Sequence, residues 1–197
     1  MDFLKTIHTI GAYFYYLQGR FGKAVQTYEK SYRGLEQFPE SMSLLYAVAA
    51  MGRSYAAIGQ ASQGLGMLDA VRKHCLKIKP TRIADWAVLQ MGYILKGIGR
   101  IEDAHQLLSE IKTKSFPLYD VRLQEDLLLL KAMLYYWKRE NEKSVKFLRE
   151  YLQIIREHEA LGMPIASYGF VLKLCWSMEQ GTYPEFKDLT VQDAVNH

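Results

Sequence analysis

The chain of 197 residues is 49% hydrophobic and 23% charged, which is a globular rather than a disordered composition and fits one domain or one repeat array. No apolar run reaches the roughly 18 residues of a membrane helix, and the start lacks the pattern of a secretory signal, so neither is expected. Residues 1–98 hold 12 basic and 6 acidic side chains and residues 99–197 hold 13 and 15, an asymmetry that suits an acidic partner but not nucleic acid.

Helical periodicity of apolar residues, broken by glycine and proline, runs along the chain and predicts an all-α fold. The predicted helices cover about residues 3–18, 22–37, 41–58, 62–78, two helices within 82–114, a pair around a polar turn at 139–142 whose second member ends near 159, one at 165–180 and a short one ending near 195. The apolar run from Leu127 to Leu134 predicts that its helix is the most deeply buried.

The sequence repeats with a period of 40 residues. Five columns at this step keep one residue class: Ala12/Gly52/Gly92/Ala132, Tyr15/Tyr55/Leu95/Tyr135, Gly19/Gly59/Gly99/Arg139, Ala24/Gly64/Ala104/Ser144 and Tyr28/Leu68/Leu108/Leu148. Arg139 is the exception. Such self-similarity is typical of stacked helical repeats.

Each period is interpreted as two helices joined by a tight turn. The two small residues, twelve positions apart, are expected where the helices cross, because a bulky side chain there would push them apart. The glycine between them supplies the left-handed backbone that ends the first helix. The large residue three positions after the first small one lies on the same helical face and packs beside the crossing.

This pattern resembles the tetratricopeptide repeat (TPR) family, whose order of small, aromatic, glycine, small and large residues is found in Gly52, Tyr55, Gly59, Gly64 and Leu68. The resemblance covers roughly residues 3–160 and implies a helical-hairpin solenoid with a right-handed superhelix. It gives four repeats in 1–160 and a partial fifth repeat or capping helices in 161–197. Two departures are the period, since the usual unit has about 34 residues, and the bulkier residues Ser31, Val71, Ile111 and Tyr151 where the family has alanine. Looser packing between the units is therefore expected.

Catalytic and metal-binding patterns are weak throughout. Gly97-Ile98-Gly99 lacks the preceding strand and the third glycine of a dinucleotide site, and Glu157-His158-Glu159 are adjacent on a helix and diverge. We therefore expect no enzyme activity, no metal and no cofactor. The two cysteines, Cys75 and Cys175, lie in different predicted helices and favour a reducing compartment, so the predicted location is cytoplasmic.

In TPR proteins the first helix of each unit lines a concave groove, and the resemblance implies which residues line it here. These candidate partner-binding residues are Tyr13, Tyr16, Tyr46, Arg53, Trp86, Gln90, Tyr93, Lys96, Asp126, Met133 and Tyr136. Aromatic and arginine side chains are common interface anchors, although the same residues would also serve to pack one repeat on the next. The family's asparagine-based hold on peptides is not expected, because the two asparagines are Asn141, in a predicted turn, and Asn196, near the C-terminus.

The predicted function is a non-enzymatic module that binds a peptide or helix of a protein partner in this groove. One alternative is a regulatory or sensor domain of a larger signalling or transcription-control protein. Another is a self-assembling scaffold unit, a homo-oligomer formed through the aromatic first helix with Tyr13 and Phe14. A basic cluster near residues 72–82 is interpreted as solvated cations at a helix C-terminus, with an acidic-partner site as the alternative.

Overall fold

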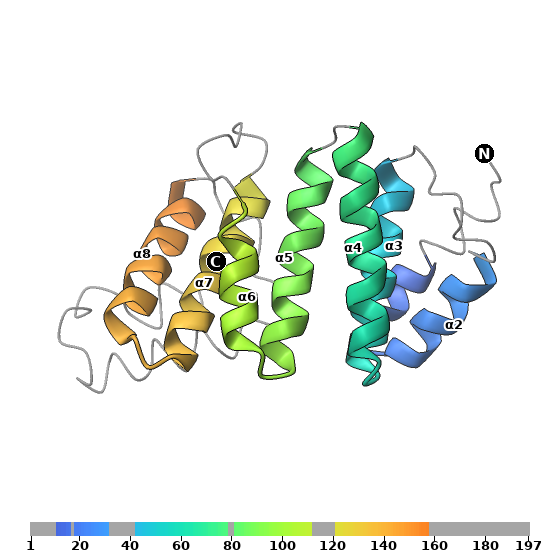
Figure 1. Ribbon diagram of the computed structural model, residues 1–197, viewed down its shortest axis with the longest axis horizontal. Coiled ribbons are helices and arrows are strands. Elements are labelled where there is room, and N and C mark those ends of the chain that lie inside the picture. Colours follow the sequence, from blue (N-terminus) through green and yellow to red (C-terminus); the bar gives the residue numbers. More distant parts are fainter. Residues whose placement is uncertain (1–10, 17, 32–41, 79–80, 112–120, 158–197) are drawn as a thin grey trace. The chain divides into compact units, whose positions relative to one another are not determined.

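The computed structural model describes residues 11–16, 18–31, 42–78, 81–111 and 121–157 (Figure 1). Every regular element in these ranges is a helix, which confirms the all-α class. A helical segment at 11–16 is followed by α2 (Phe21–Ser31), α3 (Met42–Ala57), α4 (Ala61–Ile78), α5 (Thr81–Gly97), α6 (Ile101–Leu108), α7 (Val121–Trp137) and α8 (Asn141–Glu157). The helices predicted at 165–180 and near 195, and the expected boundary at 160, lie outside the described residues.

The chain divides into two compact units, residues 1–112 and 113–197. In the first unit α3 packs against α4 and α5 against α6, while α3 also contacts α2 and α5, and α4 contacts α5. Segment 11–16 shares a core cluster with α2 through Ala12, Ala24 and Val25. In the second unit α7 packs against α8. We call segment 11–16 with α2, α3 with α4, α5 with α6, and α7 with α8 hairpins 1 to 4. The earlier member of each pair is its first helix and the later member its return helix.

The small residues of the repeat lie buried in every hairpin, as the sequence predicts. In hairpin 2 the helices approach so closely that a Cβ on Gly52 would stand 2.9 Å from the carbonyl oxygen of Gly64, and a Cβ on Gly64 would overlap that of Gly52. In hairpin 4 the Ser144 hydroxyl donates a 2.8 Å hydrogen bond to the carbonyl oxygen of Ala132. The small residues that the 40-residue period assigns to the helix crossings therefore lie at the crossings.

The turn after each first helix has one backbone geometry in all four hairpins. The residue that ends the turn donates its amide to the carbonyl five positions earlier: Arg20 to Tyr15, Gln60 to Tyr55, Arg100 to Leu95 and Glu140 to Tyr135, at 2.9–3.0 Å. The preceding residue has a positive φ of 71°, 87°, 80° and 60° at Gly19, Gly59, Gly99 and Arg139. This pair of features is the Schellman end of a helix. Arg139, the exception in the glycine column, therefore has the same positive-φ backbone conformation as the three glycines.

The positive φ of Arg139 is unfavourable for a residue with a side chain, and this can be tested by substitution. An L-residue in the left-handed region loses about 1–2 kcal/mol to crowding of its Cβ. We expect Arg139→Gly to raise the free energy of unfolding by up to about 1 kcal/mol, because the added freedom of the unfolded chain offsets part of the gain. The converse variant Gly59→Ala, at a position with no neighbour within 4 Å, should lose about 1 kcal/mol. Urea unfolding of both variants checks the signs, and a stabilised Gly59→Ala would contradict the account.

The return helix of hairpin 3 ends earlier than the sequence predicts. Helix α6 stops at Leu108, whereas helical periodicity continues to about 114. The Ser109 hydroxyl donates to the carbonyl oxygen of Gln106 at 2.6 Å, and the amides of residues 109 to 111 bond three rather than four positions back. A serine hydroxyl that bonds a carbonyl three positions earlier competes with helix continuation, which explains the early end.

Burial follows the predicted pattern elsewhere. The apolar run of α7, residues 127–130, 133 and 134, is buried throughout. Val71, Ile111 and Tyr151, which replace the small second-helix residue of the TPR pattern, are buried as well. Cys75 is a free thiol with no exposed surface, and burial raises its pKa, so this side chain acts as a small hydrophobe. Cys175 lies outside the described residues.

Candidate functional site

The first helices of hairpins 1, 2 and 3 bring an arginine close to two tyrosine rings. The Cζ atom of Arg53, on α3, lies 5.0 Å from the ring centroid of Tyr16 and 5.8 Å from that of Tyr93 on α5. Cation–π contacts of this length contribute about 0.5–1 kcal/mol each where solvent reaches them. The three residues come from three consecutive hairpins of the first unit, so the contact depends on how those hairpins pack together.

Further aromatic rings extend this contact at the N-terminal side. The rings of Tyr13 and Tyr16 are nearly parallel, 20° apart with centroids separated by 6.3 Å, and Phe21 at the start of α2 lies 5.6 Å from Tyr16 at a tilt of 56°. We call Tyr13, Tyr16, Phe21, Arg53 and Tyr93 the aromatic–arginine stack. Tyr13 is 48% exposed and the other four members are half-buried. The stack is therefore preorganised by its own contacts and still reaches the surface.

The other candidates of the first unit fall into two groups. Lys96 lies one turn after Tyr93, half-buried, and burial lowers its pKa. Trp86 is half-buried against the core cluster of hairpins 2 and 3. Gln90 is interior, with 1% of its surface exposed, because it shares the buried face of α5 with Ala87 and Ile94. Its Oε1 atom has no hydrogen bond among the described residues. The side chain of Tyr46 lies outside the described residues.

Three candidates belong to the second unit and are described with it. Asp126 and Tyr136 are half-buried on α7. Met133 is interior at 4% exposure, because α7 is apolar on most of its faces. Of the eleven residues proposed from the sequence, the structure brings together Tyr13, Tyr16, Arg53 and Tyr93. Gln90 and Met133 present no usable surface, so they are left out of the proposals below.

Sequence reasoning did not identify Phe21, or the contact that fixes the adjacent helices. The Tyr55 hydroxyl donates a 2.5 Å hydrogen bond to the carboxylate of Glu29, joining α3 of hairpin 2 to α2 of hairpin 1. The 40-residue columns gave Tyr55 a packing role alone, and Glu29 belongs to no column. No signal in one sequence pairs two residues 26 positions apart in this way.

This hydrogen bond predicts a pH dependence. Burial, followed by the hydrogen bond and the negative charge of Glu29, raises the pKa of Tyr55 from 10.0 to about 12. Because the pKa in the folded state exceeds the unfolded value, the contribution is complete below pH 10 and disappears as the pH rises through 12. We expect Tyr55→Phe to lose about 1–2 kcal/mol of stability at pH 8, and the difference from the parent to shrink between pH 10 and 12. Denaturant unfolding of the parent and of Tyr55→Phe at pH 8, 10 and 12 measures this difference in stability. A difference that stays the same at all three pH values would contradict the raised pKa of Tyr55.

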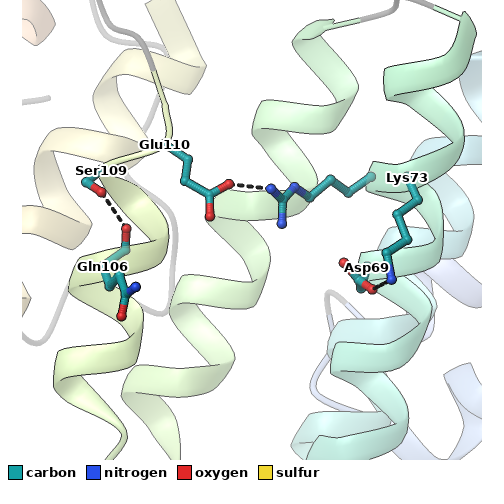
Figure 2. A network of polar contacts seen from close by, with 6 residues as sticks. Asp69, Lys73, Gln106, Ser109 and Glu110 are labelled. Atoms are coloured by element: carbon teal, nitrogen blue, oxygen red, sulfur yellow. Dashed lines mark hydrogen bonds and ion pairs between the residues drawn. The ribbon is translucent and has the colours of Figure 1, made fainter.

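The basic cluster at the end of α4 is partly neutralised by neighbouring carboxylates. Arg72 forms an ion pair with Glu110, just beyond α6, and Lys73 lies 2.6 Å from Asp69 one turn earlier on α4. Figure 2 shows Glu110 and the Asp69–Lys73 pair on the side of the hairpins formed by the return helices. These pairs favour the interpretation of the cluster as a solvated helix end.

The second unit carries an aromatic pair of its own. The rings of Tyr135 on α7 and Phe147 on α8 are parallel within 6°, with centroids 5.4 Å apart. The Lys143 ammonium lies 5.3 Å from the Tyr135 centroid and that of Lys131 lies 5.6 Å from Phe147. Lys143 also hydrogen-bonds Glu140 at 2.6 Å, which lowers the pKa of that carboxyl. These contacts join α7 to α8. Trp137, at the end of α7, is 63% exposed.

In the described ranges no group of three or more histidine, cysteine, aspartate or glutamate side chains is placed to hold a metal ion. None of the helices in those ranges combines the length and apolarity required to cross a membrane.

Comparisons with known proteins identify no relative. No protein-family model matches the chain, and neither curated proteins nor solved structures give a match.

Proposed function

We propose that the chain is a non-enzymatic protein-interaction module of the TPR type, in which the hairpins stack into a solenoid with a right-handed superhelical twist. The fourfold recurrence of the crossing and of the Schellman turn supports a repeated unit. In such an array the first helices form one continuous surface for a peptide or helix of a partner.

The observation that carries the proposal is the cation–π contact of Arg53 with both Tyr16 and Tyr93. Tyrosine and arginine are enriched among the residues that contribute most to protein interfaces, because they offer large contact areas together with hydrogen-bond donors. Rings that already hold the arginine in place reduce the entropy lost when a partner orders it. The return helices offer Arg72 and Lys73 instead, and both are engaged with carboxylates.

Partner capture by the immobilised chain tests the proposal. We expect Arg53→Ala combined with Tyr93→Ala to weaken capture about 30-fold or more, corresponding to a loss of about 2 kcal/mol. The matched control, Arg72→Ala combined with Lys73→Ala on the return helix, should retain capture. Circular dichroism of both variants checks that helix content is unchanged. If the control loses the partner while the Arg53/Tyr93 variant keeps it, the basic cluster is the site and the first-helix proposal is wrong.

Self-assembly is a second candidate, favoured by exposed aromatic side chains. Tyr13 and Phe14 are adjacent and 48% and 58% exposed. Large exposed apolar residues that lie together commonly mark association surfaces. We expect light scattering to show a mass that rises with concentration for the parent chain and stays at one chain for Phe14→Ser. A constant single-chain mass for the parent at high concentration would exclude this candidate.

A further inference from the structure

The side chain of Arg53 is half-buried, and its guanidinium carbon lies over two tyrosine rings. Rings of Tyr16 and Tyr93 approach Cζ at 5.0 Å and 5.8 Å. A guanidinium carries five N–H donors, and a cation–π contact supplies none of them with an oxygen acceptor. Within the described part of the chain, no hydrogen bond or ion pair of Arg53 accompanies these two contacts.

Other arginines of the same unit differ in this respect. Arg72 is paired with Glu110, and Arg100 donates from Nε to Asp103 at 2.5 Å. Arg20 stacks on one ring, with Cζ 5.2 Å from the centroid of Tyr15. Arg53 differs from these three arginines because it lies over two rings.

The first helices of this unit carry more basic than acidic residues. Segment 11–16 has no charged residue, α3 has Arg53 alone, and α5 adds Arg82, Asp85 and Lys96. The first helices of the unit therefore carry three cations and one anion. Lys96, one turn beyond Tyr93, is half-buried and adds its charge in surroundings poor in water.

We propose that the edge of Arg53 is the binding site for an oxyanion, a carboxylate or a phosphate, that the partner presents to the first-helix surface. A planar guanidinium fits two oxygens of such a group through two parallel N–H···O bonds, and each bond is strengthened by the charge on both partners. The rings of Tyr16 and Tyr93 restrict the rotation of the guanidinium, which fixes the direction of approach. This inference rests on the proposed function and specifies the chemistry of its partner.

The experiment is an NMR titration of the full chain that follows the arginine Nε–Hε signals. The probes are sodium phosphate and sodium acetate, each compared with sodium chloride at the same ionic strength. We expect the Arg53 signal to shift along a saturating curve, with accompanying shifts of the Tyr16 and Tyr93 ring protons. The signals of Arg20, stacked on one ring, and Arg72, already paired, should shift by less than a third as much.

A conservative variant gives the matched control. Arg53→Lys keeps the charge and loses the planar fork, so the ring-proton shifts should require at least tenfold more probe. Arg20→Lys should leave the titration of Arg53 unchanged. A thermal melt of each variant verifies that it is folded, and the titration of the parent chain stands by itself if a variant is not.

The two probes separate the sources of the oxyanion. Saturation with both, or with acetate alone, supports a partner that presents acidic side chains or a chain terminus. Saturation with phosphate alone supports a phosphorylated partner. A linear drift equal to that of Arg20 with both probes overturns the inference. If this happens while capture still depends on Arg53 and Tyr93, the oxyanion site is wrong and the interaction function stands; if capture is also unaffected, both fail.

Discussion

Gly64→Ala is expected to lower the free energy of unfolding by about 3 kcal/mol, although it adds a single methyl group. The added Cβ would overlap the carbonyl oxygen of Gly52 and come within 3.4 Å of the amide nitrogen of Ala56. Both neighbours are backbone atoms of α3, so no side-chain rotation relieves the contact and the two helices must separate. Overpacking of a closely fitted interior typically has an effect of this size.

The control for this variant lies two residues further along α4. Gly66 is exposed, and a Cβ added there meets nothing within 4 Å. Alanine is favoured over glycine inside a helix by about 0.8–1 kcal/mol, so Gly66→Ala should stabilise the chain. Urea unfolding of both variants should therefore give shifts of opposite sign. Two stabilising shifts would show that α3 and α4 do not cross at these residues.

The second large effect is expected at the crossing of hairpin 4. Ser144→Leu should destabilise the chain by about 3 kcal/mol, because a large side chain replaces a fully buried serine beside Ala132. Ser144→Ala removes the hydroxyl bond to the Ala132 carbonyl and leaves the space, and should lose about 1 kcal/mol. Thermal melts of the two variants measure the difference.

The informative result is which of the two variants, Ser144→Leu or Ser144→Ala, is less stable. If Ser144→Leu is as stable as Ser144→Ala, position 144 tolerates a large side chain and the equivalence with Gly64 is lost. An exposed substitution on the same helix, Lys146→Leu, serves as the reference for adding leucine without burial. It should change the stability by less than about 0.5 kcal/mol.

Much of the fold was predictable because the helix crossings and the turns restrict which residue types can occupy fixed positions of each repeat. Small residues are needed at Gly52 and Gly64 because two helices touch there, and glycine is favoured at Gly59 because φ is positive. Both preferences can be seen in the sequence. Four copies at one spacing made them recognisable. Arg139 shows that the backbone conformation recurs even where the residue type does not.

The site was predictable in part, for a physical reason. The TPR resemblance implied that Tyr13, Arg53 and Tyr93 line one groove, at one position of successive 40-residue periods. Helical periodicity specifies which residues share a face. It does not specify which side chains become covered when hairpins pack, so Gln90 was expected at a surface although it is interior. Nor does it give contacts between columns, such as Arg53 on Tyr16 or Tyr55 with Glu29.

Hydrogen exchange of the chain with and without its captured partner tests the central claim most directly, namely that the first helices form the binding surface. The proposal predicts that the partner slows amide exchange in residues 11–16, α3 and α5, around Arg53 and Tyr93. Exchange in α2 and α4 should change much less. Protection confined to α2 and α4, with no change in the three first helices, would contradict the claim.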